Sequence, residues 1–137
     1  MKIKTTLIII AVVLIADACK KKQDDTPTCT AGSGGNVTFV VYAKHGSTSI
    51  PNYYTHLDTA FVRYGTTSSP GTNPSNYNTY FVSEPGEDHI HCTGMKCGDY
   101  FIYRTAWDSV TNTRRYGGQG ISFSETSGEK DLIISVN

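Results

Sequence analysis

Residues 37–43 read VTFVVYA, and their side chains alternate between the two faces of an extended chain. One face carries Val37, Phe39, Val41 and Ala43, and most of the stretch is β-branched or aromatic, as strands prefer. Period-two alternation of this kind is typical of a strand with one buried face. The stretch therefore predicts a half-buried β-strand at the start of a folded domain.

Six further strand-like segments follow, separated by turn sequences rich in Gly, Pro, Asn and Ser. They lie at about residues 59–64, 79–83, 89–92, 100–107, 120–124 and 131–136. No segment after residue 19 shows the i, i+3, i+4, i+7 spacing of an amphipathic helix over three turns. The pattern predicts an all-β domain over residues 36–137, built as a single antiparallel seven-stranded β-sandwich.

Three short motifs carry a likeness to a known family of sandwiches. The first strand ends in residues 45–46 (HG), residues 50–52 (IPN) and a β-branched run follow, and residues 98–100 (GDY) open a later strand. These features resemble transthyretin-like and carboxypeptidase-regulatory-like domains, in which a Gly-x-Tyr strand start follows a short turn. The resemblance implies a transthyretin-like or immunoglobulin-like sandwich, of a class that mostly binds, spaces or stabilises.

The first 18 residues are organised as an export signal. Two lysines lie within the first four residues, and the nine-residue apolar run at 7–15 is too short to span a bilayer as a helix. Residues 16–18 (ADA) then place small side chains at −3 and −1 relative to Cys19. This motif resembles the lipobox of bacterial lipoproteins, in the looser form of the Bacteroidota type. The resemblance implies cleavage of the signal peptide 1–18 and acylation of Cys19, as by palmitate.

Residues 19–35 are predicted to be the lipidated cysteine and a flexible tether. Residues 20–25 (KKKQDD) contain no apolar side chain, and residues 26–35 are small, polar and glycine-rich. The charged run resembles the Lys/Gln-plus-acidic signal that sends some Bacteroidota lipoproteins to the outer face of the outer membrane; a plain charged linker is the alternative. We therefore expect a cell-envelope protein held to a lipid bilayer through Cys19. The expected membrane is the outer membrane, from which the domain could face the cell surface.

The charge balance argues against nucleic acid as a partner. Removing residues 1–18, which include Lys2, Lys4 and Asp17, leaves 10 Lys+Arg against 11 Asp+Glu. A nearly neutral domain has no basic surface with which to neutralise phosphates. Its 119 residues suit one domain with one core.

Three cysteines remain for disulfides once Cys19 is acylated. An exported protein folds where disulfides form, so Cys29, Cys92 and Cys97 are candidates. Cys92 and Cys97 flank a four-residue turn, and this pairing is favoured. Cys29 with Cys97 is the second possibility and would close a larger, more stabilising loop. Three reduced thiols are the remaining alternative.

If the seven strands alternate in direction, their ends sort to two poles. The cysteines then lie at the pole next to the tether. The opposite, distal pole collects these polar and aromatic residues: His45, His56, Glu87, Asp88, His89, Trp107 and Asp108. A functional site is therefore expected at the distal pole.

The run His89-Ile90-His91-Cys92 has some of the ligand types of a zinc or copper site. Along a strand His89 and His91 share one face and Cys92 faces the other, so one cation cannot easily take all three. Further ligands would have to come from the distal pole, where the candidates are His45, His56, Glu87 and Asp88. The alternative is a solvated set of polar side chains at strand ends.

No catalytic signature occurs in the sequence. It lacks Gly-x-Ser-x-Gly, His-Glu-x-x-His and a phosphate-binding glycine motif. Residues 117–120 (GGQG) precede a strand, whereas phosphate loops precede a helix, so they predict a bulge or a tight strand entry. We therefore expect no enzyme activity and no cofactor.

Tyrosines and two short acceptor motifs complete the candidates. Tyr53, Tyr54 and Tyr77 lie in loops among Asn, Ser and Thr, where they could form a glycan- or protein-binding surface or pack back onto the sheet. Residues 58–60 (DTA) and 108–110 (DSV) resemble the O-glycosylation acceptor of exported Bacteroidota proteins, which implies Thr59 and Ser109 as sites. The sequence thus predicts a membrane-anchored, non-enzymatic binding or structural module, with a metal-binding protein as the alternative.

Overall fold

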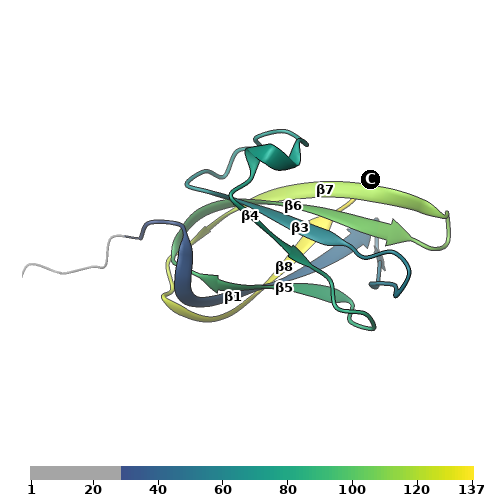
Figure 1. Cartoon of the computed structure of the whole chain (residues 1–137), viewed down its shortest axis with the longest axis horizontal. Helices are drawn as coiled ribbons and strands as arrows, with labels where there is room; N and C mark the ends of the chain where they lie inside the picture. Colours follow the sequence, from purple (N-terminus) through teal and green to yellow (C-terminus); the bar gives the residue numbers. More distant parts are fainter. Residues whose placement is uncertain (1–28) are drawn as a thin grey trace, which may run out of the picture.

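The computed structural model describes residues 29–137 as a β-structure (Figure 1). Predictions that fall on residues 1–28, including the signal peptide and the acylated Cys19, lie outside the described residues. The strands are β1 (Ser33–His45), β2 (Thr48–Ser49), β3 (Thr59–Tyr64), β4 (Thr79–Val82), β5 (His89–Met95), β6 (Gly98–Asp108), β7 (Thr113–Phe123) and β8 (Ser127–Ser135). A single 3-10 turn, η1 (Pro74–Asn76), is the only helical element in this range, and no helix within it could cross a membrane. The all-β prediction is confirmed.

Two four-stranded sheets pack face to face. One contains β2, β1 and β5, with β8 also pairing with β1; the other has the order β4-β3-β6-β7. Figure 1 shows β1, β5 and β8 as the lower layer and β4, β3, β6 and β7 as the upper one. The sandwich prediction is therefore confirmed, with the two-residue β2 added to the seven strands expected.

One ladder departs from the antiparallel prediction. Strands β1 and β8 run parallel, in register from Asn36 opposite Ser127 to Lys44 opposite Ser135. All other named ladders are antiparallel. The seven long strands alternate in direction as expected, so the first and the last run the same way, and their adjacency makes the pair parallel.

The core lies between the sheets and is formed by alternate residues of each strand. Val37, Phe39, Val41 and Ala43 are all at most 1 % exposed, which confirms the predicted buried face of β1. Phe39 packs edge-on against Tyr100 of the opposite sheet, with ring centroids 5.2 Å apart. Contacts of this kind tie the two sheets together beyond the burial of apolar area alone.

Strand β7 is longer than predicted because its glycines lie inside the strand. A side chain at Gly118 would overlap the ring of Phe101, and one at Gly120 would overlap the backbone of Thr67. Glycine inside a strand commonly marks a close approach of other atoms. The expectation of a bulge or strand entry at 117–120 is therefore wrong.

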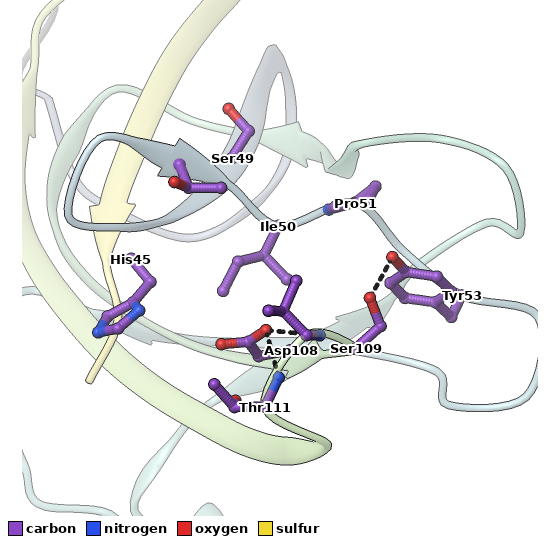
Figure 2. A pocket seen from close by; sticks show the side chains of 10 residues that line it. His45, Ser49, Ile50, Pro51, Tyr53, Asp108, Ser109 and Thr111 are labelled. Carbon is purple, nitrogen blue, oxygen red and sulfur yellow. Dashed lines mark hydrogen bonds between the residues drawn. The ribbon is translucent and has the colours of Figure 1, made fainter.

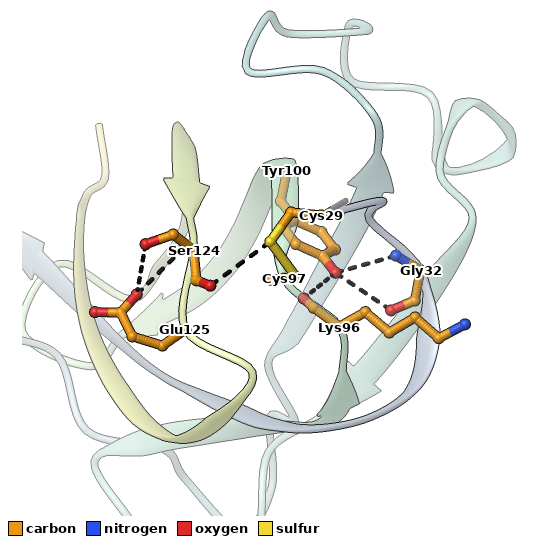
Figure 3. The surroundings of a disulfide bond; sticks show 7 residues. All are labelled: Cys29, Gly32, Lys96, Cys97, Tyr100, Ser124 and Glu125. Carbon is orange, nitrogen blue, oxygen red and sulfur yellow. Dashed lines mark hydrogen bonds between the residues drawn. A yellow bond between two sulfur atoms is a disulfide. The ribbon is translucent and has the colours of Figure 1, made fainter. Parts of the chain in front are cut away.

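The folded domain begins earlier than predicted. Residues 33–35, which the sequence assigned to the tether, belong to β1. Cys29 forms a disulfide with Cys97, with Cα atoms 5.0 Å apart (Figure 3). The hydroxyl of Tyr100 accepts from the Gly32 amide at 3.0 Å and donates to the Lys96 carbonyl at 2.5 Å, which fixes the same segment.

The favoured pairing of Cys92 with Cys97 is wrong. Cys92 lies within β5 opposite Phe39, and its side chain is fully buried in the core. It stays unpaired within residues 29–137. Burial raises the pKa of its thiol to about 12, so Cys92 is a packed and poorly nucleophilic side chain.

Candidate functional site

Three metal-ligating side chains converge at the start of β5. Because side chains alternate along a strand, His89 and His91 both face outward from the first sheet, while Ile90 and Cys92 are buried. The Nε2 atoms of the two histidines are 2.9 Å apart. Glu87 Oε2, from the turn before the strand, is 3.6 Å from His89 Nε2 and 3.8 Å from His91 Nε2. The predicted sharing of one face is thus confirmed, and Cys92 is turned away as expected.

The backbone around this cluster is held by the interior of the protein. The side-chain amide of Asn52 donates to the His89 carbonyl at 2.7 Å, and the Asn52 backbone amide donates to the Glu87 carbonyl at 3.0 Å. Arg104, which is fully buried, donates to Asn52 Oδ1 at 2.9 Å and also to the Val41 carbonyl. Core and cluster are therefore joined through Asn52.

Arg104 belongs to a buried polar group at the distal end of the core. Asp58 is also fully buried; its Oδ1 accepts from the Trp107 amide at 2.9 Å. Burial raises the pKa of Asp58, and the charges of Arg104 and Arg114 oppose that rise. Burial lowers the pKa of Arg104 to about 10, partly offset by Asp58. These two charges compensate each other inside the sandwich.

The other two histidines predicted as ligands lie elsewhere. The ring of His56 stacks on Trp107, with centroids 3.9 Å apart and an interplanar angle of 6°. His45 is exposed and lines a surface pocket of about 300 Å³ at the distal pole (Figure 2). Two of the four predicted histidines therefore come together, with Glu87 as their third partner.

The pocket beside His45 is lined in part by the turn after β6, whose polar groups bond within the turn. Asp108 Oδ1 accepts from the amides of Val110 and Thr111, and Asp108 Oδ2 accepts from Arg115 Nε at 2.6 Å. The hydrogen bond from Arg115 holds the pKa of Asp108 at about 2. The hydroxyl groups of Ser109 and Tyr53 are 2.6 Å apart (Figure 2). The polar groups of the turn serve its own structure.

The two predicted O-glycosylation sites differ in accessibility. Ser109 is exposed at the turn after β6. Thr59 is half-buried between Asp58 and Ala60, which are both fully buried, and its amide donates to Thr105 Oγ1 at 3.0 Å. Ser109 is the more accessible of the two.

A row of aromatic side chains crosses the outer face of the second sheet. Phe61 lies opposite Tyr80 of β4 on one side and Tyr103 of β6 on the other, and Tyr116 of β7 is next to Tyr103. Tyr77 joins them from the loop before β4, nearly parallel to Tyr103 at a centroid distance of 5.9 Å. We call these five residues the aromatic row. Tyr80 is 64 % exposed and Tyr116 46 % exposed, so the two ends of the row are open to solvent, while Phe61, Tyr77 and Tyr103 are half-buried.

The loop between β3 and β4 borders this row. Figure 1 shows it, with η1, standing above the second sheet. The Tyr77 hydroxyl donates to the Gly71 carbonyl at 2.7 Å, and the Asn76 side chain donates to the Pro70 carbonyl at 2.7 Å. Burial raises the pKa of Tyr77 to about 12. The loop therefore has its own internal structure, in which the side chains of Thr66, Ser69, Asn73, Ser75 and Asn76 form hydrogen bonds within the loop.

The sequence singled out Tyr77 but missed the rest of the row. Tyr53 is half-buried with its hydroxyl 2.6 Å from Ser109 Oγ, and Tyr54 is 78 % exposed; both lie in the loop before β3, outside the four strands that the row crosses. The signal was present in Phe61, Tyr80 and Tyr103, which occupy alternate, outward positions of their strands. Only the strand order β4-β3-β6-β7 brings them side by side.

Comparison with known proteins gives no relative from which a function could be transferred. No protein-family model matches the chain, and neither a curated protein nor a solved structure is significantly similar to it. Function is therefore inferred from the residues and their geometry.

Proposed function

We propose that this protein is a lipid-anchored, non-enzymatic module of the cell envelope that binds carbohydrate through the aromatic row. The observation that carries the proposal is the line of rings from Tyr80 through Phe61 and Tyr103 to Tyr116, across all four strands of one sheet. Monomeric proteins seldom leave such contiguous apolar faces in water unless a partner uses them.

The chemistry of the row suits a sugar. Aromatic rings offer flat apolar faces to the C–H faces of a pyranose, while tyrosine hydroxyls supply polar edges. The bordering loop, residues 65–78 (GTTSSPGTNPSNYN), carries no charged side chain, which suits a neutral glycan. A protein partner would call for a fully apolar centre with a wide rim, and three of the five rings here are already half-buried.

The anchor supports an envelope location. The lipobox-like motif ends at Cys19, and the described fold begins with the disulfide at Cys29. Ten residues of extended chain reach at most about 35 Å, so acylation of Cys19 would keep the domain close to the membrane surface. A polymer on the cell surface is within the reach of such a domain.

Binding is tested with the full-length protein in detergent on an array of neutral glucans, mannans and chitin fragments. We expect binding of at least one class and a loss of more than about tenfold for Tyr80→Ala and Tyr116→Ala, because truncating a tyrosine that anchors an interface commonly costs about 2 kcal/mol or more. Tyr54→Ala is the matched control, since Tyr54 is an exposed tyrosine outside the row. Absence of glycan binding, or equal losses in all three variants, contradicts the proposal.

The anchor is tested separately. Full-length Cys19→Ser is expressed with a metabolically incorporated fatty-acid label and fractionated. We expect the label and the membrane association to disappear together. A variant that remains in the membrane fraction would show that Cys19 is not the anchor, whatever the outcome of the glycan array.

A further inference from the structure

We propose that Glu87, His89 and His91 bind one divalent transition-metal ion on the outer face of the first sheet. We call these three residues the metal triad. The site lies on the sheet opposite to the aromatic row and is independent of the proposed carbohydrate function.

The spacing of the three ligand atoms matches the size of such an ion. The separations are 2.9 Å between the two Nε2 atoms and 3.6 and 3.8 Å from Glu87 Oε2 to His89 and His91. A circle through three points with these separations has a radius of about 2.0 Å, and zinc lies about 2.0–2.1 Å from imidazole nitrogen and carboxylate oxygen. An ion at or just above the centre of the triad would therefore reach all three atoms at coordination distance.

A carboxylate orients one of the two imidazoles. Asp88 Oδ1 lies 2.8 Å from His89 Nδ1. When His89 donates its Nδ1 proton to Asp88, its Nε2, which faces His91 and Glu87, carries no proton and can bind an ion. A second-shell carboxylate of this kind fixes the tautomer of a ligating histidine and makes it a better donor of electrons.

Glu87 gives a second, independent indication. Its Oε2 atom is buried and has no hydrogen-bond partner among residues 29–137. A desolvated carboxylate oxygen without a partner is costly, and a cation beside it removes that cost. The same oxygen is the one that faces both histidines.

The triad is held in place before any ion binds. Asn52 fixes the backbone at both Glu87 and His89, and buried Arg104 fixes Asn52. Tyr42 of β1 packs against the His89 ring at a centroid distance of 5.2 Å. Ligands whose positions are set by packing and outer hydrogen bonds lose little freedom on binding.

The donor set selects the class of ion. Two imidazole nitrogens and one carboxylate oxygen suit zinc and copper, whereas calcium and magnesium prefer oxygen ligands alone. The side chains of His91 and Glu87 are 38 % and 35 % exposed, which leaves an open side for water or an outside ligand as a fourth partner. We infer a three-ligand, solvent-accessible zinc or copper site.

The proposal is tested by calorimetric titration of the chelator-treated full-length protein with Zn²⁺ and with Cu²⁺. We expect one ion per chain. His89→Ala and His91→Ala should weaken binding more than about 100-fold, and Asp88→Asn about 10- to 100-fold, as expected for loss of an orienting partner. His45→Ala is the matched control, because His45 is an exposed histidine outside the triad.

The absorption of bound Co²⁺ reports on its coordination and does not depend on the overall stability of the protein. Co²⁺ bound by the wild-type chain should show visible absorption bands of low-coordinate cobalt, and these should vanish in His91→Ala while circular dichroism stays unchanged. Glu87→Gln keeps the shape of the side chain but removes its charge, and should weaken binding strongly.

Two results would overturn the metal site. In one, the wild type takes up neither Zn²⁺ nor Cu²⁺ in stoichiometric amount, which would mean that the three side chains are linked only by hydrogen bonds. In the other, His45→Ala weakens binding as much as His89→Ala, which would place the ion elsewhere. Neither result bears on carbohydrate binding at the aromatic row.

Discussion

Two charged residues are fully buried in the described part of the protein, where an uncompensated charge is costly. Arg104 and Asp58 are both fully buried, and Arg104 Nε and Asp58 Oδ2 have no hydrogen-bond partner within the described range. Each ion is tolerated because the other lies near it, and because Arg104 also bonds Val41 and Asn52. Removing Arg104 would leave Asp58 with only the partly exposed Arg114, 3.5 Å from its Oδ1, as a countercharge in a medium of low polarity.

Arg104→Met should lower the free energy of unfolding by about 3–5 kcal/mol, as measured by urea denaturation, because it leaves Asp58 without its main countercharge. Adding Asp58→Asn to that variant should recover part of the loss, since the stranded carboxylate is then gone. Equal stability of the single and the double variant would contradict this compensation.

Asp108 should make the protein sensitive to acid. Its folded-state pKa is about 2, held down by the hydrogen bond from Arg115, against an ordinary value of 3.8. As the pH falls the unfolded chain therefore binds the proton first. The stabilising contribution is complete above about pH 4 and is lost as the pH falls from about 4 to about 2.

Asp108→Asn should consequently have a lower melting temperature than the wild type at pH 6, with a difference that shrinks toward pH 2. Arg115→Ala should reproduce this behaviour, and the double variant should add little to either single one. A difference that grows on acidification would show that the hydrogen bond to Arg115 does not control the group.

The sequence named all three members of the metal triad among its candidate ligands but could not separate them from the other candidates. Alternation along a strand places His89 and His91 on one face, and that prediction is confirmed. His56 could not be separated from them, because its position depends on a stack with Trp107 formed by chain segments 51 residues apart. Contacts that depend on loop conformation carry no periodic signal.

Among the elements, the start of the domain is held by a disulfide bond. The disulfide joins Cys29, just before β1, to Cys97, just before β6, across a sequence separation of 68 residues. Its main contribution in the chain-entropy model is the restriction of the unfolded chain. The bond therefore stabilises the whole domain as well as its first turn.

Replacing both Cys29 and Cys97 by Ser should lower the free energy of unfolding by about 4 kcal/mol, the loop-closure value for this separation. Urea denaturation measures the loss. Cys92→Ala is the control, because it should leave the Cys29–Cys97 cross-link intact in peptide mapping. Finding Cys92 in any disulfide of the wild type would contradict the assignment.

The burial of Cys92 is encoded in the local sequence pattern of β5. The same alternation that turns Cys92 away from His89 and His91 points it into the core. A cysteine facing the core of β5 cannot meet Cys97 across a short turn. By contrast, the length of β7 could not be foreseen, because its glycines are explained by Phe101 and Thr67 from other elements.

For the whole molecule, the two outer faces differ in chemistry. One sheet carries the metal triad and the other the aromatic row, with the closely packed core between them. Perturbations on opposite faces of a packed domain usually act additively.

Tyr116→Ala should therefore leave the affinity for Zn²⁺ within about twofold of the wild type, and His91→Ala should leave carbohydrate binding equally unchanged. Calorimetry of each variant with each ligand measures both. A mutual loss would show that the two faces are coupled through the core.

The class and layer arrangement followed from local patterns, and the sheet order did not. Alternating residues in β1 and the turn sequences between strands were enough to predict a sandwich. The adjacency of β1 and β8 joins residues about 90 positions apart, and nothing in either strand encodes its partner. A long-range choice of this kind is made by the fit of the two sheets as a whole.

If the domain is anchored at Cys19 and holds a polymer as proposed, the position of Cys29 has a mechanical consequence. Tension on the tether would enter the fold at this residue and divide there. One share would pass along β1, whose bonds to β8 from Asn36 to Lys44 are loaded in shear and must yield together. The other share would pass through the sulfur bridge into β6 and the opposite sheet. Force applied to the anchor would thus be shared by both sheets. Neither sheet would lose its strand hydrogen bonds one after another from one end.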